Sequence, residues 1–307
     1  MMYDLIIIGG GPAGATAGIY ASRKKIKTLL ITKNFGGLMS GKSVTIENYP
    51  GFEEISGSDL ISRFEKHLKK QQIEVENDSV IKIEKNNQEF SVLTEKNKQF
   101  QSKAVIIASG SEPRNLGLPE EKEFIGRGVS YCSTCDGPFF SNKDVAVAGG
   151  GNSGFETAIS LTDYAKKIYI LEAGKELKAD EVLQEKAKKS GKIEIITGAS
   201  IKKIQGEKFV SSLVFEDQKK DLKILEVQGL FVEIGWQPAT SFVKGLADLN
   251  EKGEIAIDFK NNQTKVPGLF AAGDSSSVLY KQIIVAAGEG AKAALSAYEY
   301  LQKEKEE

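Results

Sequence analysis

Two stretches of the sequence repeat each other at a constant offset of 140 residues. YDLIIIGGGPAGATAGIYASRKKIKTLLITK begins at Tyr3, and KDVAVAGGGNSGFETAISLTDYAKKIYILEA begins at Lys143. Each has the hydrophobic pattern of a buried strand, a glycine turn, a helix and a second strand, which together make a βαβ unit. A chain with two such units is predicted to be an α/β protein, and its 307 residues are enough for two domains.

Both units carry the pattern G-x-G-x-x-G directly after the first strand, at Gly9, Gly11 and Gly14 and again at Gly149, Gly151 and Gly154. The first glycine makes a tight turn, the second lets the backbone approach a pyrophosphate, and the third lets helix and strand pack closely. The pyrophosphate then lies on the amides and the positive dipole of the helix N-terminus. One match is a weak indication. Two matches in the required context predict that the chain binds two dinucleotides.

The two copies differ at the end of the second strand, where Thr32 corresponds to Glu172. A carboxylate about 20 residues into such a unit accepts hydrogen bonds from the adenosine ribose and repels a 2′-phosphate. At an effective dielectric constant near 20 and about 5 Å, this repulsion is roughly 3 kcal/mol per unit charge before screening. Half of it is more than a tenfold difference in affinity. We therefore predict NADH over NADPH; a solvent-facing Glu172, with Lys175 or Lys178 binding a phosphate, is the alternative.

The rest of the chain fits one domain interrupted by the other. The later predicted elements are a β-hairpin and strand in 89–114 with a turn near Gly110, a strand in 225–238, a strand in 264–274 and a helix in 281–302. The simplest arrangement inserts a domain of residues 113–245 into a domain formed by residues 1–112 and 246–307.

The composition excludes several classes of protein. The net charge is −1, without the basic excess that binding to nucleic acid or an anionic membrane requires. No apolar run approaches the roughly 20 residues of a membrane span, and no basic leader with an apolar region opens the chain. Two cysteines in a chain of this size argue against a secreted disulfide scaffold. We predict a cytoplasmic protein that binds neither nucleic acid nor membrane.

Both cysteines lie in YCSTCDG, residues 131–137, as Cys132 and Cys135. A zinc site needs four ligands, or three and a water, and the one histidine, His67, lies in a polar helical stretch and is interpreted as a surface residue. We therefore expect no metal. A staple that closes a four-residue loop gives only roughly 2 kcal/mol, and the cytosol tends to keep such a pair reduced. The i, i+3 spacing favours a redox pair near a helix N-terminus.

Asp136 directly follows the second cysteine. Dithiol chemistry needs a proton donor and acceptor, so we predict that Asp136 is a general acid; a turn or helix-cap role is the alternative. Two dinucleotides and one dithiol indicate an electron relay. A flavin joins them, because it accepts a hydride and also reacts with a thiolate. The first unit, which ends in Thr32 and lacks the carboxylate, is then the FAD site.

These motifs together resemble the low-molecular-weight thioredoxin reductases over essentially the whole chain. The matching stretches are GGGPAG at 9–14, FGG at 35–37, IENYPG at 46–51, CSTCD at 132–136, GGGNSG at 149–154, and GLFAAGD at 268–274 followed by KQI at 281–283. Within that family, LEAGKELKAD at 171–180 and the last predicted helix are most similar to the flavoprotein subunit of alkyl hydroperoxide reductase.

The resemblance implies two nested Rossmann-like, three-layer domains and a homodimer with tightly bound FAD. It further implies that the nicotinamide domain carries the CxxC and rotates. It also implies that Cys135 faces the flavin and that Cys132 attacks the partner. Asn48 and Asp274 are expected against FAD, with Gln282 and Ile283 at the pyrimidine end of the flavin. The full set of expected FAD residues is Gly9, Gly11, Pro12, Ala13, Gly14, Thr32, Gly36, Gly37, Asn48, Gly110, Gly273, Asp274, Gln282 and Ile283. The expected nicotinamide-nucleotide residues are Gly149, Gly151, Asn152, Ser153, Gly154 and Glu172.

Three departures from the family bear on function. Leu171, Glu172 and Ala173 stand where NADPH-binding members place His-Arg-Arg, which agrees with NADH. Leu38 replaces a glutamine that offers the flavin a hydrogen bond. The sequence begins with the FAD strand instead of an N-terminal extension, which predicts a separate acceptor protein.

The leading prediction is therefore an FAD-dependent disulfide reductase that passes electrons from NADH to a thioredoxin- or glutaredoxin-like protein. The alternatives are an NADPH-dependent thioredoxin reductase, a dithiol oxidase, a ferredoxin-linked reductase and a redox sensor without turnover. The intact second glycine motif argues against the oxidase and the ferredoxin-linked reductase.

Overall fold

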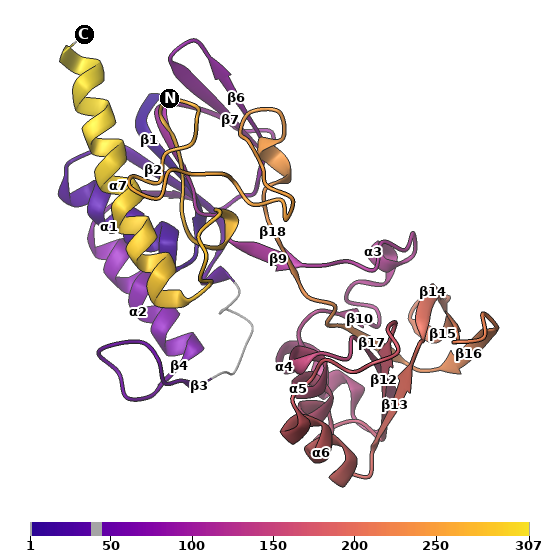
Figure 1. Ribbon diagram of the computed structural model, residues 1–307. Helices are drawn as coiled ribbons and strands as arrows, with labels where there is room; N and C mark the ends of the chain where they lie inside the picture. Colours follow the sequence, from indigo (N-terminus) through magenta and orange to yellow (C-terminus); the bar gives the residue numbers. More distant parts are fainter. Residues whose placement is uncertain (1, 38–44, 307) are drawn as a thin grey trace. The chain divides into compact units, whose positions relative to one another are not determined.

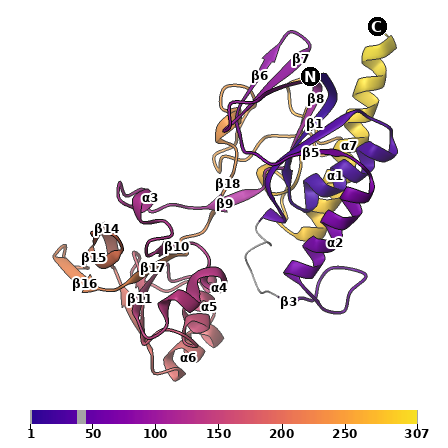
Figure 2. The same ribbon diagram turned by 180° about the vertical axis from the view of Figure 1, so that it is seen from behind.

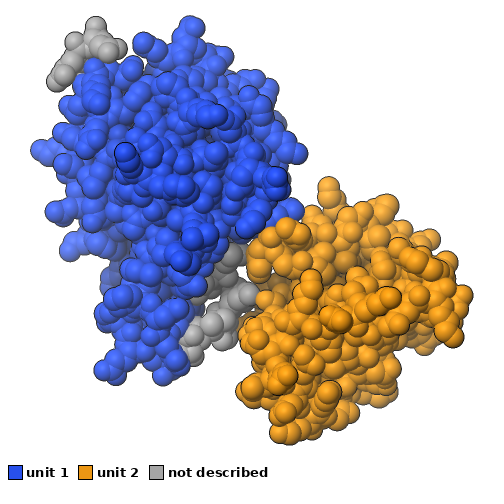
Figure 3. Space-filling model, in the orientation of Figure 1, with its two compact units in different colours: residues 1–112, 237–307 blue, residues 113–236 orange. Residues whose placement is uncertain are grey.

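The structure is a computed structural model that describes residues 2–37 and 45–306. The chain divides into two compact units, one of residues 1–112 and 237–307 and one of residues 113–236 (Figure 3). The chain thus returns to the first unit at residue 237, whereas the sequence analysis assigned residues as far as 245 to the inserted domain. The reason is the short helix η3, Ser241–Val243, whose Val243 is fully buried in the apolar core of the first unit.

The outgoing and returning segments pair with each other at this boundary. Strand β9, Ser111–Pro113, forms a two-stranded sheet with β18, Trp236–Pro238. A backbone hydrogen bond lies at each end of this two-stranded sheet, from Ala239 N to Gly110 O at 3.0 Å and from Arg114 N to Gly235 O at 2.9 Å.

The first unit is built on a seven-stranded sheet. Its strands are β1 Met2–Gly10, β2 Thr28–Phe35, β5 Glu74–Glu76, β6 Val80–Asn86, β7 Glu89–Thr94, β8 Gln99–Ile107 and β19 Leu269–Ala271. The order is β5-β2-β1-β8-β7-β6, and β19 also pairs with β8. The strands around β1 run parallel, as βαβ connections require, whereas β6, β7 and β8 are antiparallel. A small pair, β3 Thr45–Ile46 and β4 Ile55–Ser56, lies outside this sheet.

Side chains from the two faces of β1 enter two apolar layers of the first unit. Leu5 and Ile7 pack among residues of the helices α1 Pro12–Arg23, α2 Gly57–Lys70 and α7 Ile283–Glu306, whereas Ile6 and Ile8 pack among residues of β6 and β7. Helix α7 runs along α1 in both views (Figures 1 and 2). A Cβ at Gly290 of α7 would lie 2.0 Å from the carbonyl oxygen of Ala13, so glycine allows this close approach.

The second unit has a five-stranded parallel sheet in the order β10-β17-β11-β12-β13. Its strands are β10 Val129–Ser130, β11 Asp144–Ala148, β12 Lys167–Glu172, β13 Ile193–Thr197 and β17 Gly229–Val232. One apolar layer joins this sheet to α5 Asn152–Leu161 and α6 Glu181–Lys189, and another joins it to an antiparallel sheet of β14 Ser200–Gly206, β15 Val210–Glu216 and β16 Leu222–Glu226. Three short helices complete the unit, α3 Glu121–Phe124, α4 Ser133–Asp136 and η2 Gly137–Phe140.

The repeat in the sequence is thus a repeat in the structure. Strand β1, helix α1 and strand β2 correspond to β11, α5 and β12, and in each unit the two strands pair in parallel. The predicted α/β class with two three-layer, Rossmann-like domains is confirmed. Within residues 2–37 and 45–306, no helix combines the length and apolar character needed to cross a membrane.

Candidate functional site

The first glycine turn leaves a helix N-terminus open. Gly9 has φ +110°, and a Cβ there would lie 2.2 Å from the carbonyl oxygen of Ala108. A Cβ at Gly14 would lie 1.8 Å from the oxygen of Gly9, so the third glycine lets α1 pack on the turn. Gly11 is the N-cap of α1, no side chain caps it, and no atom lies within 4 Å of a Cβ built there. The first amides of α1 therefore have room for an anionic group.

The second glycine turn repeats this geometry. Gly149 has φ +121°, and a Cβ there would lie 2.2 Å from the carbonyl oxygen of Glu233, which directly follows β17. A Cβ at Gly154 would lie 2.0 Å from the oxygen of Gly149, whereas the position at Gly151 is open. Gly151 is the N-cap of α5 and also lacks a side-chain cap.

Thr32 and Glu172 behave differently at the two turns. Thr32 is buried, and its hydroxyl donates a hydrogen bond to the oxygen of Asn34 at 2.8 Å. The carboxylate of Glu172 instead accepts hydrogen bonds from the amides of Gly150 and Gly174, both at 2.6 Å. The charge of Glu172 is therefore held at the glycine turn of the second unit.

Asn152 and Ser153 open helix α5, and Asn152 has a partner that the sequence analysis missed. Its side-chain amide donates to Asp180 Oδ2 at 2.9 Å, and its oxygen accepts from the amide of Asp180 at 2.8 Å. The amide of Lys178 donates to the oxygen of Gly150 at 3.0 Å. The segment from Gly174 to Asp180 is thus tied to the second glycine turn at both ends.

Several of the other residues expected at FAD gather at the first turn. The amide of Gly36 donates to the oxygen of Gly10 at 2.9 Å, and a Cβ at Gly37 would lie 3.9 Å from the Cα of Gly11. Gly273, with φ +70°, approaches α1, because its Cβ would lie 3.1 Å from that of Ala13. Pro12 is the first residue of α1. Leu38 lies outside the described residues.

A second group of these residues lies where the chain enters α7. The side-chain amide of Asn48 donates to Gln282 Oε1 at 3.3 Å, which joins two segments far apart in the sequence. Ile283 packs against the buried cluster of Ile46, Ile55 and Leu60. Gly110 belongs to neither group. It lies just before the chain leaves the first unit, and its carbonyl oxygen accepts a hydrogen bond from the amide of Ala239.

Asp274 lies in the short helix η4, Gly273–Ser275, and its carboxyl group is partly buried. Burial raises the pKa of this carboxyl above its usual value, against the attraction of Lys281; Glu254 raises it further. Lys281 forms an ion pair with Glu254 at 2.9 Å and donates to the backbone oxygens of Asp274 and Ser276 at 3.3 and 2.6 Å. Lys281 carries no signal of this role in the sequence, because its partners Glu254, Asp274 and Ser276 lie at three separate positions.

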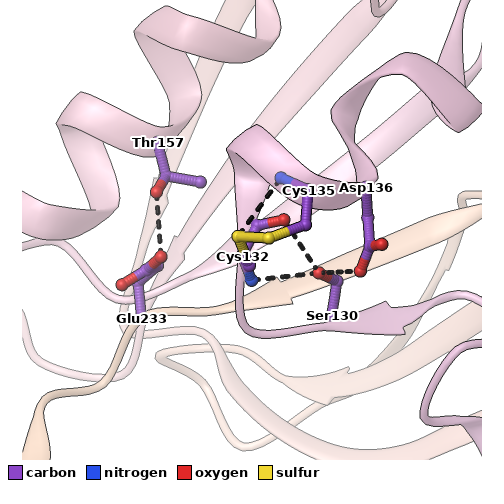
Figure 4. The surroundings of a disulfide bond; sticks show 6 residues. All are labelled: Ser130, Cys132, Cys135, Asp136, Thr157 and Glu233. Atoms are coloured by element: carbon purple, nitrogen blue, oxygen red, sulfur yellow. Dashed lines mark hydrogen bonds between the residues drawn. A yellow bond between two sulfur atoms is a disulfide. The ribbon is translucent and has the colours of Figure 1, made fainter. Parts of the chain in front are cut away.

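The two cysteines form a disulfide with their Cα atoms 5.4 Å apart (Figure 4). Cys132 is the N-cap of α4, and its sulfur accepts a hydrogen bond from the amide of Cys135 at 3.2 Å. The pair therefore sits at a helix start, the position that the spacing predicted.

Asp136 is held by a serine that the sequence analysis overlooked. Ser130, which is buried at the end of β10, donates from its hydroxyl to Asp136 Oδ2 at 2.6 Å and accepts from the amide of Cys132 at 3.0 Å (Figure 4). Asp136 occupies the N-cap position of η2 but makes no side-chain cap there. The cap role weighed as an alternative is thus not what this carboxylate does.

Tyr131, next to Cys132, is anchored by a buried carboxylate. Its hydroxyl donates to Glu121 Oε1 at 2.6 Å, and Glu121 also accepts from the amides of Leu116 and Gly117 at 2.9 and 3.0 Å. Burial and this hydrogen bond to Glu121 raise the pKa of Tyr131 far above its usual value. Glu121 lies among several acidic residues, so nothing in the sequence distinguished it.

Comparison with known proteins gives the family. A profile described as pyridine nucleotide-disulphide oxidoreductase matches residues 3–290. The chain belongs to this family. The predicted class of enzyme, an oxidoreductase of disulfides, is thereby confirmed, and membership implies the use of FAD and a pyridine nucleotide. Both open glycine turns fit such groups, since each offers uncapped amides at a helix N-terminus.

Two known proteins match nearly the whole chain. It is 41% identical over 300 residues to an NADH dehydrogenase of Bacillus subtilis and 41% identical over 301 residues to the F subunit of alkyl hydroperoxide reductase of Staphylococcus aureus. These alignments cover 97% of this chain but only 58% and 59% of those proteins, so the chain spans about three fifths of their length.

Solved thioredoxin reductases share its fold and length. That of Lactococcus lactis (FR conformation) aligns with a TM-score of 0.84 and 37% identity, over 98% of this chain and 99% of that one. That of T. acidophilum aligns with a TM-score of 0.80 and 36% identity, over 97% and 98%. The predicted resemblance to the low-molecular-weight thioredoxin reductases is confirmed.

Among the described residues, no group of three or more His, Cys, Asp or Glu is arranged to hold a metal ion. His67 lies on the exposed face of α2.

Proposed function

We propose that the protein is an NADH-preferring, FAD-dependent disulfide reductase that passes electrons through Cys135 and Cys132 to a small thioredoxin- or glutaredoxin-like protein. The observation that carries this proposal is the disulfide at the start of α4. It lies in the same unit as the second glycine turn and beside the hydrogen-bonded pair of Ser130 and Asp136.

The two glycine turns are assigned to different cofactors. We assign FAD to the first turn, where Gly36 and Gly273 join Gly9, Gly11 and Gly14, and the nicotinamide nucleotide to the second. When bound, FAD supplies an acceptor for hydride and a donor of electrons to a disulfide. The backbone amides at the start of each helix bind and orient the dinucleotides, and the glycines make the turns tight and leave room for the pyrophosphate.

The choice of NADH rests on Glu172. Its carboxylate is held at the glycine turn by two amides, so it cannot easily swing away from an approaching 2′-phosphate. Each oxygen of this carboxylate has a further lone pair, which can accept a hydrogen bond from a ribose hydroxyl of NADH. The relative from Bacillus subtilis named NADH dehydrogenase supports this choice.

The thiol chemistry balances two electrons and two protons. Reduction of the Cys132–Cys135 disulfide gives two thiols, and we assign to Asp136 the donation and acceptance of one of the protons. The thiolate of Cys132 attacks the disulfide of the partner and forms a mixed disulfide, releasing one partner thiol. Cys135 then attacks Cys132, which restores the disulfide and releases the second partner thiol. The roles of the two cysteines follow from the family resemblance.

The partner class is inferred from the relatives. Some are named thioredoxin reductase and others are the F subunit of alkyl hydroperoxide reductase, so a protein with a redox-active disulfide suits both. We further infer a cytoplasmic homodimer in which the unit that carries the dithiol rotates. The alternative is an NADPH-dependent thioredoxin reductase, and the alignment with solved thioredoxin reductases over 99% and 98% of their chains supports a thioredoxin as the partner.

Stopped-flow bleaching of the flavin absorbance by NADH, then by NADPH, tests the cofactor assignment. We expect faster bleaching by NADH. Faster bleaching by NADPH would select the alternative, and no bleaching by either would sink the proposal. A Cys135→Ser variant, which keeps Cys132 alone, should trap the partner as a mixed disulfide that a reductant releases. Cys132→Ser is the matched control, because it lacks the attacking thiol.

A further inference from the structure

The hydroxyl of Ser130 has more acceptors than it has hydrogens. Its Oγ lies 2.6 Å from Asp136 Oδ2 and 3.2 Å from the carbonyl oxygen of Cys132. It also accepts a hydrogen bond from the amide of Cys132 at 3.0 Å. A serine hydroxyl has one hydrogen and two lone pairs, so it can donate to only one of the two oxygens at a time. The two donations are therefore alternatives.

We propose that Ser130 is the positioning residue that holds Asp136 in both of its protonation states, by turning its one hydrogen between the carboxylate and the carbonyl oxygen of Cys132. This inference rests on the proposed function, in which Asp136 gives and takes a proton. With Asp136 ionised, Ser130 donates to the carboxylate. With Asp136 protonated, the carboxyl group donates to Ser130 Oγ, and the serine hydrogen turns to Cys132 O. No proton is gained or lost by Ser130.

Ser130 Oγ and the carbonyl oxygen of Cys132 have enough lone pairs for the hydrogen bonds of both states. In the second state, Ser130 Oγ accepts from the Cys132 amide and from the Asp136 carboxyl group, which uses its two lone pairs. Cys132 O already accepts from the amide of Asp136 at 3.1 Å and has a second lone pair for the serine. The turn of one hydroxyl therefore keeps the acid and the base form of Asp136 in the same place.

Ser130 is well fixed for this task. It is 3% exposed, and its backbone belongs to β10, which pairs with β17 in register with Phe231. A buried hydroxyl without partners is costly, and Ser130 makes two hydrogen bonds when Asp136 is ionised and three when it is protonated, which suits a site where a proton is gained and lost.

The other titratable groups nearby have their own partners or roles (Figure 4). The carboxylate of Glu233 accepts from the hydroxyl of Thr157 at 2.9 Å, and Tyr131 donates to Glu121. Cys132 and Cys135 are the reacting thiols. Asp136 is the carboxylate to which the hydroxyl of Ser130 is hydrogen-bonded.

The test compares Ser130→Ala, Ser130→Thr, Asp136→Asn and the double variant S130A/D136N as holoenzymes. The assay is the NADH-driven reduction of 5,5′-dithiobis(2-nitrobenzoate), a small disulfide, as a function of pH. Ser212→Ala is the matched control, because its hydroxyl bonds to Gln205 on the separate antiparallel sheet of the same unit. Thermal unfolding of each variant checks that it is folded.

The proposal predicts a particular pattern. Asp136→Asn should lower the rate by about 100-fold and remove one limb of the pH profile. Ser130→Ala should lower the maximum rate of the pH profile by about tenfold. The midpoint of the same limb should stay within about 0.3 pH units of the wild-type value, because the serine is hydrogen-bonded to both forms of the acid. Ser130→Thr keeps the hydroxyl and should stay within about twofold of the wild-type rate. Adding Ser130→Ala to Asp136→Asn should cost nothing more.

Four results would overturn the inference, and a fifth would refute the acid role on which it rests. A limb that moves up by about one pH unit in Ser130→Ala would mean that the serine serves the carboxylate form alone. Additive losses in the double variant, or a loss in Ser130→Thr equal to that in Ser130→Ala, would make the hydroxyl merely structural. If Asp136→Asn keeps the wild-type rate of disulfide reduction, the acid role in the proposed function is refuted. If Asp136→Asn is slow while Ser130→Ala keeps the wild-type rate, only the role of Ser130 is refuted.

Discussion

The two βαβ units of this chain share a backbone and differ in chemistry. In both, the second strand ends beside the middle of the glycine turn, since a Cβ at Gly10 would touch Thr32 and a Cβ at Gly150 would touch Glu172. Thr32 satisfies its hydroxyl locally, whereas Glu172 binds two amides of the turn. The dithiol belongs to the second unit alone. The two units thus share the backbone of the glycine turn, whereas the side chain that ends the second strand makes different contacts in each.

The largest expected effect is the loss of protein-disulfide reduction when either cysteine is replaced, while the reaction that depends on the two glycine turns persists. Cys132→Ser and Cys135→Ser should each lower protein-disulfide reduction on the order of 1000-fold or more, because a nucleophile is removed. Bleaching of the flavin by NADH should persist, since it needs only the two dinucleotide sites. Single-turnover and steady-state rates measure the two steps separately. If both variants still reduce the partner, the dithiol is not the route.

Alanine at the third glycine of each turn should affect one cofactor at a time. A Cβ at Gly14 or Gly154 would overlap a backbone oxygen, and such overpacking lowers the free energy of unfolding by roughly 1–3 kcal/mol. We expect Gly14→Ala to be purified with depleted flavin, and Gly154→Ala to keep its flavin but bind NADH roughly 100-fold more weakly, a difference of about 2.7 kcal/mol.

Flavin absorbance per protein and NADH titration measure these two effects. Gly288→Ala is the control, because that helical glycine is exposed and has no atom within 4 Å of its Cβ position. Loss of flavin from Gly154→Ala, with full flavin in Gly14→Ala, would reverse the assignment of the two units.

Glu172 should account for roughly a tenfold preference between nucleotides. Glu172→Gln keeps the size of the side chain and an oxygen acceptor for one amide but removes the charge that repels a 2′-phosphate. We expect the ratio of kcat/KM for NADH over NADPH to fall about tenfold, which corresponds to about 1.4 kcal/mol. Thr32→Ser in the other unit is the matched control and should leave the ratio unchanged. An unchanged ratio in Glu172→Gln would show that another group makes the choice.

The smallest expected effect is a pH-dependent gain in stability at Asp274. Burial raises the pKa of this carboxyl, so the folded protein holds its proton more tightly than the unfolded chain does. The charged form therefore costs stability above the folded pKa, and this cost disappears as the pH falls below the unfolded value.

Asp274→Asn should thus raise the unfolding midpoint of the flavin-free protein at pH 7 by about 2 °C, and by less near pH 4. Asp163→Asn, at an exposed position of the second unit, is the control in differential scanning calorimetry. A lower midpoint for Asp274→Asn at pH 7 would contradict this account.

Much of the fold followed from the sequence because its signals are local. The strand patterns and glycine spacings around Gly9 and Gly149 predicted both βαβ units, since each is encoded within about 30 adjacent residues. The boundary at residue 237 did not follow. In the sequence, the segment 237–245 continues a predicted strand and turn without a break. Long-range contacts assign it to the first unit, namely the hydrogen bond from Ala239 to Gly110 and the burial of Val243 in the core.

The candidate site divides in the same way. By itself, the sequence determined the two glycine turns, the CxxC pair and the carboxylates at 136 and 172, because residue type and spacing carry their chemistry. Only the tertiary structure decided their partners. Glu121 lies beside Tyr131, Asp180 beside Asn152 and Gln282 beside Asn48 through contacts that span 10, 28 and 234 residues. No local pattern encodes such contacts, because they form when separate elements pack together.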